Sequence, residues 1–232
     1  MINKATYYLT PNAASTAFTG TGYTPDGTIP AGAIPCTQSQ AQNFQAYVPS
    51  NGEIVAAPDA VLLAQAQAAQ KALVTTGYNT ATDYVPVTIN GTAYQVDNTA
   101  GKQALNLSLA ITANAMMQAP AWAASTEYTA GAYCNVGGVI LFCSTSGKSG
   151  SSAPTPPTTF GTPVTDGTAA WELMGRKVYL QGGSFVYMTP QQLMSAFQQG
   201  ELYLHQMSDK LELLKSEIMA ATTVSAVQTF TF

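Results

Sequence analysis

Few residues in this chain of 232 could carry out chemistry. His205 is the only histidine, so a Ser-His-Asp triad, a histidine metal site or a histidine acid–base pair would each require it. It follows Glu201 by one helical turn and lies beside an apolar stripe, which favours a solvent-facing or helix-paired side chain. We therefore expect no histidine chemistry.

Paired carboxylates could hydrolyse glycosides, but the acidic residues number only 12. Asp166 in "TDGT" is typical of a turn, and Glu127 follows a Ser-Thr pair that also favours a turn. A further group is expected on the solvated face of one helix: Glu201, Asp209, Glu212 and Glu217. The sequence therefore predicts a chain that is not an enzyme.

Metal and cofactor motifs are missing from the sequence. Cys134 and Cys143 have no histidine or further cysteine nearby, so their spacing does not make a zinc site. "GTGYTPDG" is a cluster of turn residues, and neither a Walker A loop nor a Rossmann glycine pattern occurs. We expect no metal and no cofactor.

The cysteines number three, an odd set for a disulfide framework. If Gly137-Gly138 turns a two-residue hairpin, Cys134 faces Leu141 and Cys143 faces Ala132, so the two thiols are not cross-strand partners. We expect reduced, partly buried thiols, as in a protein that folds in a bacterial cytoplasm.

The composition limits the kinds of partner. Charged residues make up 9% of the chain, against roughly 25% in ordinary soluble domains, so the surface must consist largely of uncharged polar residues. The net charge of -4 leaves no basic patch, and we expect no nucleic-acid binding. No window approaches about 18 apolar residues and the N-terminus lacks an apolar run, so we expect no membrane insertion and no signal peptide.

The elements that must position any site begin with an N-terminal module, residues 1–75. An aromatic strand, "ATYYLT", precedes a Gly/Thr-rich turn region. Thr37 and Gln40 form a capping box, which predicts a helix from there to about Tyr47. "SNGEIVAAP" predicts a turn and a short strand, and the segment 59–74 is rich in helix-forming residues.

Two hairpin–helix patterns follow. One turns at Asn90-Gly91 and leads into a helix over 99–117; the other turns at Gly182-Gly183 and leads into the longest helix. The inward candidates on the first helix are Leu105, Leu109 and Ile111.

The segment between these patterns is rich in Thr, Ser, Pro and Gly and shows no helical periodicity, so it predicts only turns and strands. We therefore predict an α+β fold: a scaffold domain formed by 76–118 plus 176–232, interrupted by an all-β module at 119–175.

The longest helix starts with Thr189, Pro190 and Gln192 at the N-cap, N1 and N3 positions. Its apolar positions alternate in steps of four and three: Leu193, Phe197, Gly200, Leu204, Met207, Leu211, Leu214 and Ile218. This period suits a coiled-coil seam, which would make a homo-oligomer through the 189–220 helix. It equally suits an amphipathic helix packed on its own domain.

The flanking segments resemble bacteriophage proteins. "IPAGAIPCTQSQAQNFQAYVPSNGEIVAAPDAVLLAQAQAAQKA" is similar to the N-terminal part of tail-fibre-assembly-type proteins. Residues 83–118 joined to 176–220, with "GGSFVYMTPQQL", resemble a domain found beside it in tail-fibre-associated proteins. The resemblance implies a location in the virion tail after assembly in the host bacterial cytoplasm, with tail-fibre or baseplate proteins as partners.

The inserted segment has a resemblance of its own. "WAASTEYTAGAYCNVGGVILFCSTSGKSGSSAPT" with "VTDGTAAWE" is similar to the chitinase-type carbohydrate-binding modules of families five and twelve and to their relatives in phage tail proteins. The matching pattern comprises Trp122, Tyr128, Gly131, Tyr133, Gly137, Phe142, Pro154 and Trp171. We expect both tryptophans in the core, because so small a fold needs their buried area.

The long loop departs from the glycan-binding members of this group. They place an exposed aromatic residue before the proline that ends the loop, where this chain has Ser152 and Ala153. The candidate ligand-binding residues are instead other aromatics of the module: Tyr128, Tyr133, Phe142 and Phe160.

The resulting hypothesis is a non-enzymatic structural component of a phage tail, fibre-associated or at the fibre tip. Its β module would bind a host surface glycan or a virion protein. Two alternatives remain: a tail-fibre assembly chaperone absent from the mature virion, and an outer capsid decoration protein.

Overall fold

The computed structural model describes residues 6–232, which form two compact units. One unit holds the chain up to Val74 together with Leu213–Phe232, and the other holds Thr75–Glu212. Helices account for 39% and strands for 30% of the structure, in small sheets, which confirms the predicted α+β class. Residues 213–232 thus fold with the N-terminal segment, whereas the inserted module shares a unit with both hairpins.

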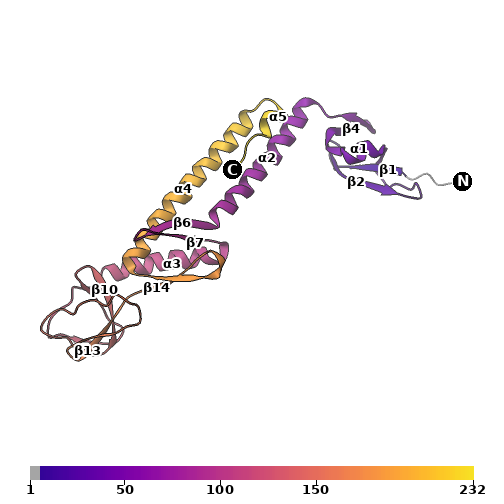
Figure 1. Cartoon of the computed structure of the whole chain (residues 1–232). Coiled ribbons are helices and arrows are strands. Elements are labelled where there is room, and N and C mark those ends of the chain that lie inside the picture. Colours follow the sequence, from indigo (N-terminus) through magenta and orange to yellow (C-terminus); the bar gives the residue numbers. More distant parts are fainter. Residues whose placement is uncertain (1–5) are drawn as a thin grey trace. The chain divides into compact units, whose positions relative to one another are not determined.

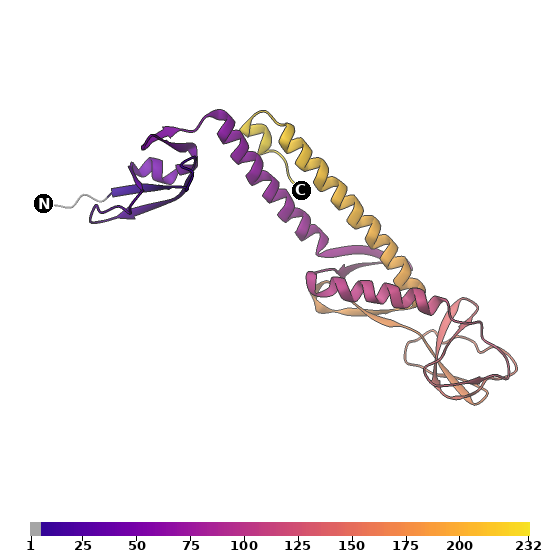
Figure 2. The ribbon, with the colours of Figure 1, turned by 180° about the vertical axis from the view of Figure 1, so that it is seen from behind.

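The first unit begins with a three-stranded antiparallel sheet in the order β2-β1-β3. The strands are β1 (Thr6–Pro11), β2 (Phe18–Thr24) and β3 (Ile34–Cys36). The short helix α1 (Gln38–Gln42) contacts β1 and β2 (Figure 2).

The predicted capping box of Thr37 and Gln40 is present, but the helix is shorter than predicted. It ends at Gln42, a 3-10 turn covers Phe44–Ala46, and Tyr47 already starts β4 (Tyr47–Ser50). The aromatic and β-branched residues here pair with β5 (Glu53–Ala56) across the predicted Asn-Gly turn, and this pairing overrides the helical signal.

The first unit also contains parts of the two longest helices and the C-terminal segment. Helix α2 (Asp59–Thr82) starts where predicted, and α4 (Pro190–Ala220) is followed by α5 (Val224–Val227). The Gln67 amide donates to the carbonyl oxygens of Met219 and Ala221, each at 3.2 Å. No helix among residues 6–232 is both long enough and apolar enough to cross a membrane.

The second unit is built on the two predicted hairpins, and both are confirmed. The strands β6 (Tyr84–Ile89) and β7 (Thr92–Asp97) pair across Asn90-Gly91, whose φ angles of 50° and 79° are those that a tight hairpin turn requires. The strands β14 (Arg176–Tyr179) and β15 (Phe185–Met188) form the other hairpin. A bridge between Val96 and Leu180 joins the hairpins.

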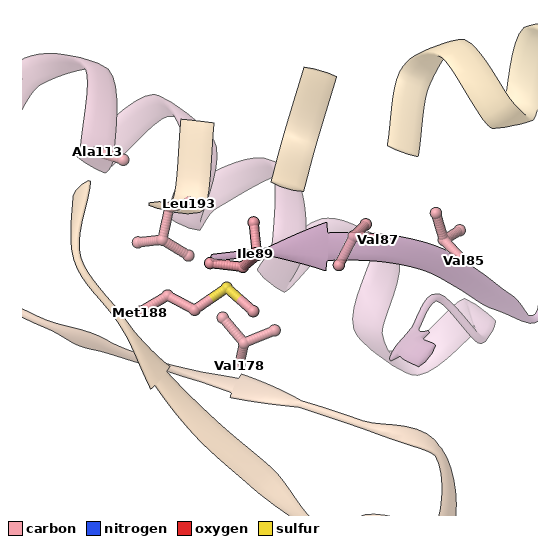
Figure 3. Close-up of a cluster of buried hydrophobic side chains, with 7 residues drawn as sticks. All are labelled: Val85, Val87, Ile89, Ala113, Val178, Met188 and Leu193. Carbon is pink, nitrogen blue, oxygen red and sulfur yellow. The ribbon is translucent and has the colours of Figure 1, made fainter. Parts of the chain in front are cut away.

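The scaffold core lies between these hairpins, α3 (Ala100–Met117) and α4 (Figure 3). Alternate residues of β6 point to one side, as the period of a strand requires. The buried cluster consists of Val85, Val87, Ile89, Ala113, Val178, Met188 and Leu193. Thr189 and Gln192 cap α4 reciprocally, with hydrogen bonds of 2.8 Å and 3.3 Å, as predicted.

The inward face of α3 differs from the prediction. Ile111 is 63% exposed and Leu105 is 38% exposed, whereas Leu109 is half-buried and packs on the core. The buried positions are Ala110, Ala113 and Met116. The buried stripe therefore consists mostly of small residues, of which Ala113 packs in the scaffold core, and the larger side chains of Leu105 and Ile111 lie outside that stripe.

The seam of α4 is at least partly buried along its whole length. Leu193, Gly200, Leu211 and Ile218 are buried, and the seam residues between them are half-buried. Leu193 and Leu204 belong to the scaffold core, and a Cβ on Gly200 would lie 3.3 Å from the Val85 Cγ1 atom. This packing supports the amphipathic-helix interpretation for the first half of α4, and self-association through 189–220 stays a prediction.

The inserted module has a four-stranded sheet in the order β12-β13-β10-β9, and β8 (Glu127–Tyr128) pairs with β11 (Gly147–Lys148). The four strands are β9 (Tyr133–Val136), β10 (Val139–Thr145), β12 (Val164–Asp166) and β13 (Ala169–Leu173). Cys134 pairs with Leu141, and the Cys143 N–H donates to the Ala132 carbonyl at 2.8 Å, so the predicted register is confirmed. All three cysteines are free.

One face of this sheet forms the core of the module. Trp171 is fully buried with Cys134, Leu141 and Cys143, and Trp122 packs against them, which confirms the expected core position of the tryptophans.

Asp166 connects the two tryptophans of the module. The Trp122 and Trp171 indole N–H groups both donate to Asp166 Oδ2, at 2.8 Å and 3.1 Å, and the Gly150 N–H donates to Oδ1 at 2.8 Å. Asp166 ends β12, directly before the turn at Gly167, but the turn prediction missed its burial: only 6% of the residue is exposed.

The other face of the sheet packs on the scaffold. Ile140 and Met174 are buried with Met116 at the end of α3, and Tyr133 and Phe142 pack around them. Figure 1 shows β10 beside this end of α3. Side chains of the inserted module and of the scaffold thus pack together where the two parts meet.

Candidate functional site

An aromatic groove of about 410 Å³ lies where the inserted module meets the β14–β15 hairpin. Its aromatic rings are those of Tyr133, Phe142, Phe160 and Tyr187. The remaining lining residues are Gly161 and the connection between the two parts: Glu172, Leu173, Met174, Gly175 and Arg176.

Strand pairing positions the first two rings. Tyr133 on β9 and Phe142 on β10 are cross-strand partners, and their ring centroids are 5.8 Å apart at 48°. Because side chains alternate along a strand, these rings lie on the face opposite the buried Cys134 and Leu141. Such cross-strand aromatic pairs are a main source of sheet stability.

The other two rings come from a loop and from the scaffold. Phe160 lies 5.6 Å from Tyr187, centroid to centroid, and Tyr187 meets Phe185 edge-on at 5.8 Å. Tyr187 is 46% exposed. A Cβ on Gly175 would lie 2.2 Å from the Phe160 ring, so the absence of a side chain at Gly175 makes room for Phe160.

The charged groups of the aromatic groove balance each other. Glu172 and Arg176 both line it, and the Lys177 Nζ atom lies 3.8 Å from the Phe185 ring centroid beside it. Glu172 is the one carboxylate among the described lining residues, so the groove lacks the carboxylate pair of a glycosidase. Flat rings together with a carboxylate, a guanidinium and two tyrosines suit binding of a ligand that is partly apolar and partly polar.

The structure brings together three of the four predicted ligand-binding residues. Tyr133, Phe142 and Phe160 share the aromatic groove, but Tyr128 does not line it. The Tyr128 ring packs edge-on against Trp171 at 4.7 Å, and its hydroxyl accepts the Ala123 N–H at 2.9 Å. Tyr128 is therefore part of the module core.

The sequence prediction missed Tyr187 and Arg176. A signal was present in "SFVYM", where Phe185 and Tyr187 alternate with Val186 and Met188. In a strand that packs on one face, such alternation exposes the two aromatic rings, and both are exposed here. Ser152 and Ala153 are exposed and do not line the aromatic groove.

The other groups considered for chemistry are dispersed. His205 is exposed on α4. Within residues 6–232, no group of three or more His, Cys, Asp or Glu side chains could hold a metal ion. Burial, with a smaller contribution from Cys143, raises the pKa of the Cys134 thiol to about 12, which keeps it protonated and unreactive near neutral pH.

No protein family, curated protein or solved structure matches this chain.

Proposed function

We propose that this chain is a non-enzymatic structural component of a bacteriophage tail, fibre-associated or at the fibre tip. In this proposal the aromatic groove binds a host surface glycan or a neighbouring virion protein. The observation that carries the binding part is the convergence of four aromatic rings with Glu172 and Arg176. The assignment to a tail depends on the resemblance of the flanking segments to tail-fibre-associated proteins.

The chemistry of the aromatic groove suits either ligand. Aromatic faces stack on the apolar face of a sugar ring or on aliphatic side chains, and the carboxylate and guanidinium exchange hydrogen bonds with hydroxyl or amide groups. A groove formed by so few residues gives modest affinity at each copy. Several copies on one particle supply the avidity that attachment to a cell requires.

The rest of the molecule agrees with an external virion component. Only 9% of its residues are charged, so its surface is mostly uncharged and polar. Its three free cysteines suit folding in the reducing host cytoplasm before assembly. Neither feature distinguishes a tail protein from a head protein, so location on the particle is the decisive property.

Quantitative mass spectrometry of purified particles tests the proposal. A structural component remains at a fixed ratio to known tail proteins after extensive purification. An assembly chaperone, which the N-terminal resemblance also favours, would be abundant in infected cells and absent from particles. A capsid decoration protein would be present in proportion to the head protein and would separate with purified heads.

A further inference from the structure

Two lysine side chains lie over aromatic rings beside the aromatic groove. The Lys102 Nζ atom lies 3.9 Å from the centroid of the Tyr179 ring, and the Lys177 Nζ atom lies 5.8 Å from the same centroid. The Lys177 Nζ atom is also 3.8 Å from the Phe185 ring centroid. These are the distances of cation–π contacts. We call Lys102, Lys177, Tyr179 and Phe185 the lysine strip.

Strand pairing positions most of the lysine strip. On the β14–β15 hairpin, Tyr179 pairs with Phe185 and Lys177 pairs with Tyr187 across the two strands. Because side chains alternate along a strand, these four residues share the face opposite Val178, which is buried in the scaffold core. Phe185 meets Tyr187 edge-on at 5.8 Å, and Tyr187 lines the aromatic groove. The lysine strip therefore continues directly into the aromatic groove.

The two lysines carry positive charge that the chain does not neutralise. Within residues 6–232, the side chains of Lys102 and Lys177 form no ion pair. Asp97, close to Lys102 in the sequence, instead accepts hydrogen bonds from the Thr99 N–H and hydroxyl groups at 3.1 Å and 2.7 Å. The aromatic groove contains one carboxylate and one guanidinium, so the lysine strip adds a local excess of positive charge to a chain of net charge -4. Such a local field attracts an anionic ligand.

Both lysines are held in place for such a ligand. Lys102 and Lys177 are half-buried, and their contacts with the rings restrict the ammonium groups. Less side-chain freedom is therefore lost on binding than with fully exposed lysines. Each ammonium group has three N–H donors, so it can contact a ring and a carboxylate together. The sequence hides this cluster, because the two lysines are 75 residues apart and only the fold brings them to one ring.

We propose that the lysine strip and the aromatic groove together bind an acidic polysaccharide, a sugar chain that carries carboxylate groups. Carboxylates of the sugar chain contact Lys102 and Lys177, and an adjoining sugar ring lies in the aromatic groove. There Glu172 and Arg176 exchange hydrogen bonds with its hydroxyl groups. This ligand assignment rests on the proposed function and narrows its ligand to one class of glycan.

An acidic peptide would also satisfy the two lysines, but the rings beside them favour the sugar. In a peptide, each carboxylate takes the place of an apolar side chain that could pack on a ring. A sugar acid carries a carboxylate and an apolar ring face in the same residue, so it matches charges and rings that alternate over a short distance. Tyr187 and Phe185, which are 46% and 48% exposed, are available for such stacking.

Binding of the full chain to defined polymers tests this assignment. The chain is attached densely to a sensor surface, so that weak single contacts add up. The acidic probes are polygalacturonate, hyaluronate and alginate, the neutral probe is dextran, and the acidic peptide probe is polyglutamate. We expect at least one acidic polysaccharide to bind roughly tenfold or more tightly than dextran and polyglutamate. Raising NaCl from about 0.05 M to 0.5 M should weaken that binding, because salt screens exposed charges.

Three variants separate the charge of the lysine strip from its packing. The double variant Lys102→Gln, Lys177→Gln should weaken binding to the acidic polysaccharide roughly tenfold. Lys177→Arg keeps the charge and should bind within about twofold of the wild type. Lys148→Gln is the matched control, because Lys148 is an exposed lysine of the inserted module outside the lysine strip, and it should bind as the wild type does. Circular dichroism checks that each variant folds.

Each outcome decides the assignment. Equal binding of dextran and the acidic polysaccharides overturns it, and so does a double variant that binds as tightly as Lys148→Gln. If Tyr187→Ala still weakens binding in those cases, the aromatic groove remains the glycan site and the proposed function stands. Tighter binding to polyglutamate than to any sugar polymer overturns the assignment in favour of an acidic protein partner, and binding to none of the probes also overturns it. The content of purified particles, which does not depend on the ligand, tests the proposed function separately.

Discussion

Asp166 should contribute more to the stability of the inserted module than any other acidic residue there. Its carboxylate accepts three hydrogen bonds, two from indole N–H groups and one from the Gly150 N–H, and only 6% of the residue is exposed. Asp166→Ala leaves all three donors without this acceptor. A buried donor left without an acceptor costs about 1–3 kcal/mol, so with three such donors we expect about 4 kcal/mol of destabilisation.

Asp166→Asn keeps the shape of the side chain and removes its negative charge. The amide oxygen can keep both indole donors in place of Oδ2, but the NH2 group then faces the Gly150 N–H, which is also a donor. We expect a loss of about 2 kcal/mol, between the wild type and Asp166→Ala. Glu127→Gln is the control, because it removes the same charge from an exposed position in the same module and should change stability by less than about 0.5 kcal/mol.

Urea unfolding followed by tryptophan fluorescence measures this effect directly. Both tryptophans of the chain, Trp122 and Trp171, lie in the inserted module, so their emission reports its unfolding. If Asp166→Ala unfolds at the same urea concentration as the wild type, the three hydrogen bonds do not hold the module together. If Glu127→Gln is equally destabilised, net charge rather than hydrogen bonding explains the loss.

Two further predictions concern the aromatic groove and the buried thiol. Tyr187→Ala should weaken binding of the full chain to host cells or to a glycan array roughly tenfold. Tyr23→Ala truncates an exposed tyrosine of the other unit and should leave binding unchanged. Equal losses in the two variants would contradict the assignment of the aromatic groove as the binding site. Because the pKa of Cys134 rises from 9.0 to about 12 on folding, the folded state holds this proton more tightly, so its stabilising effect is complete below pH 9 and is lost as pH rises toward 12. Urea unfolding should show this loss at up to ~1.4 kcal/mol per pH unit, and Cys134→Ala should remove that part of the slope; an unchanged slope would contradict it.

Much of the fold could be predicted because its signals are local. Asn90-Gly91 and Gly182-Gly183 specify hairpin turns by their backbone preferences, and Thr189 with Gln192 specifies the start of α4 by a reciprocal cap. These signals need no knowledge of the rest of the chain. The helix predicted up to Tyr47 was too long because strand pairing, a tertiary effect, determines the structure there.

The orientation of α3 could not be predicted from the size of its side chains. Leu105 and Ile111 are more hydrophobic than Ala110 and Ala113, yet the alanines face the core. Which face a helix buries depends on how closely it approaches its neighbours, and that distance is not encoded in the helix alone.

The aromatic groove shows the same limit. Tyr133 and Phe142 could be predicted from the sequence because one hairpin register places them side by side. Tyr187 is 45 residues further along the chain than Phe142, and only the packing of the module on the scaffold brings them to one groove. Asp166 was missed for a related reason, since its indole partners converge only when the sheet forms.

Imaging of intact particles by cryo-electron microscopy tests the central claim most directly. With a small tag on the C-terminus of this chain, the account predicts label at a fixed number of positions on the tail, at or beside the fibres. Label confined to the head, or tagged chain found in infected cells but on no particle, would contradict it.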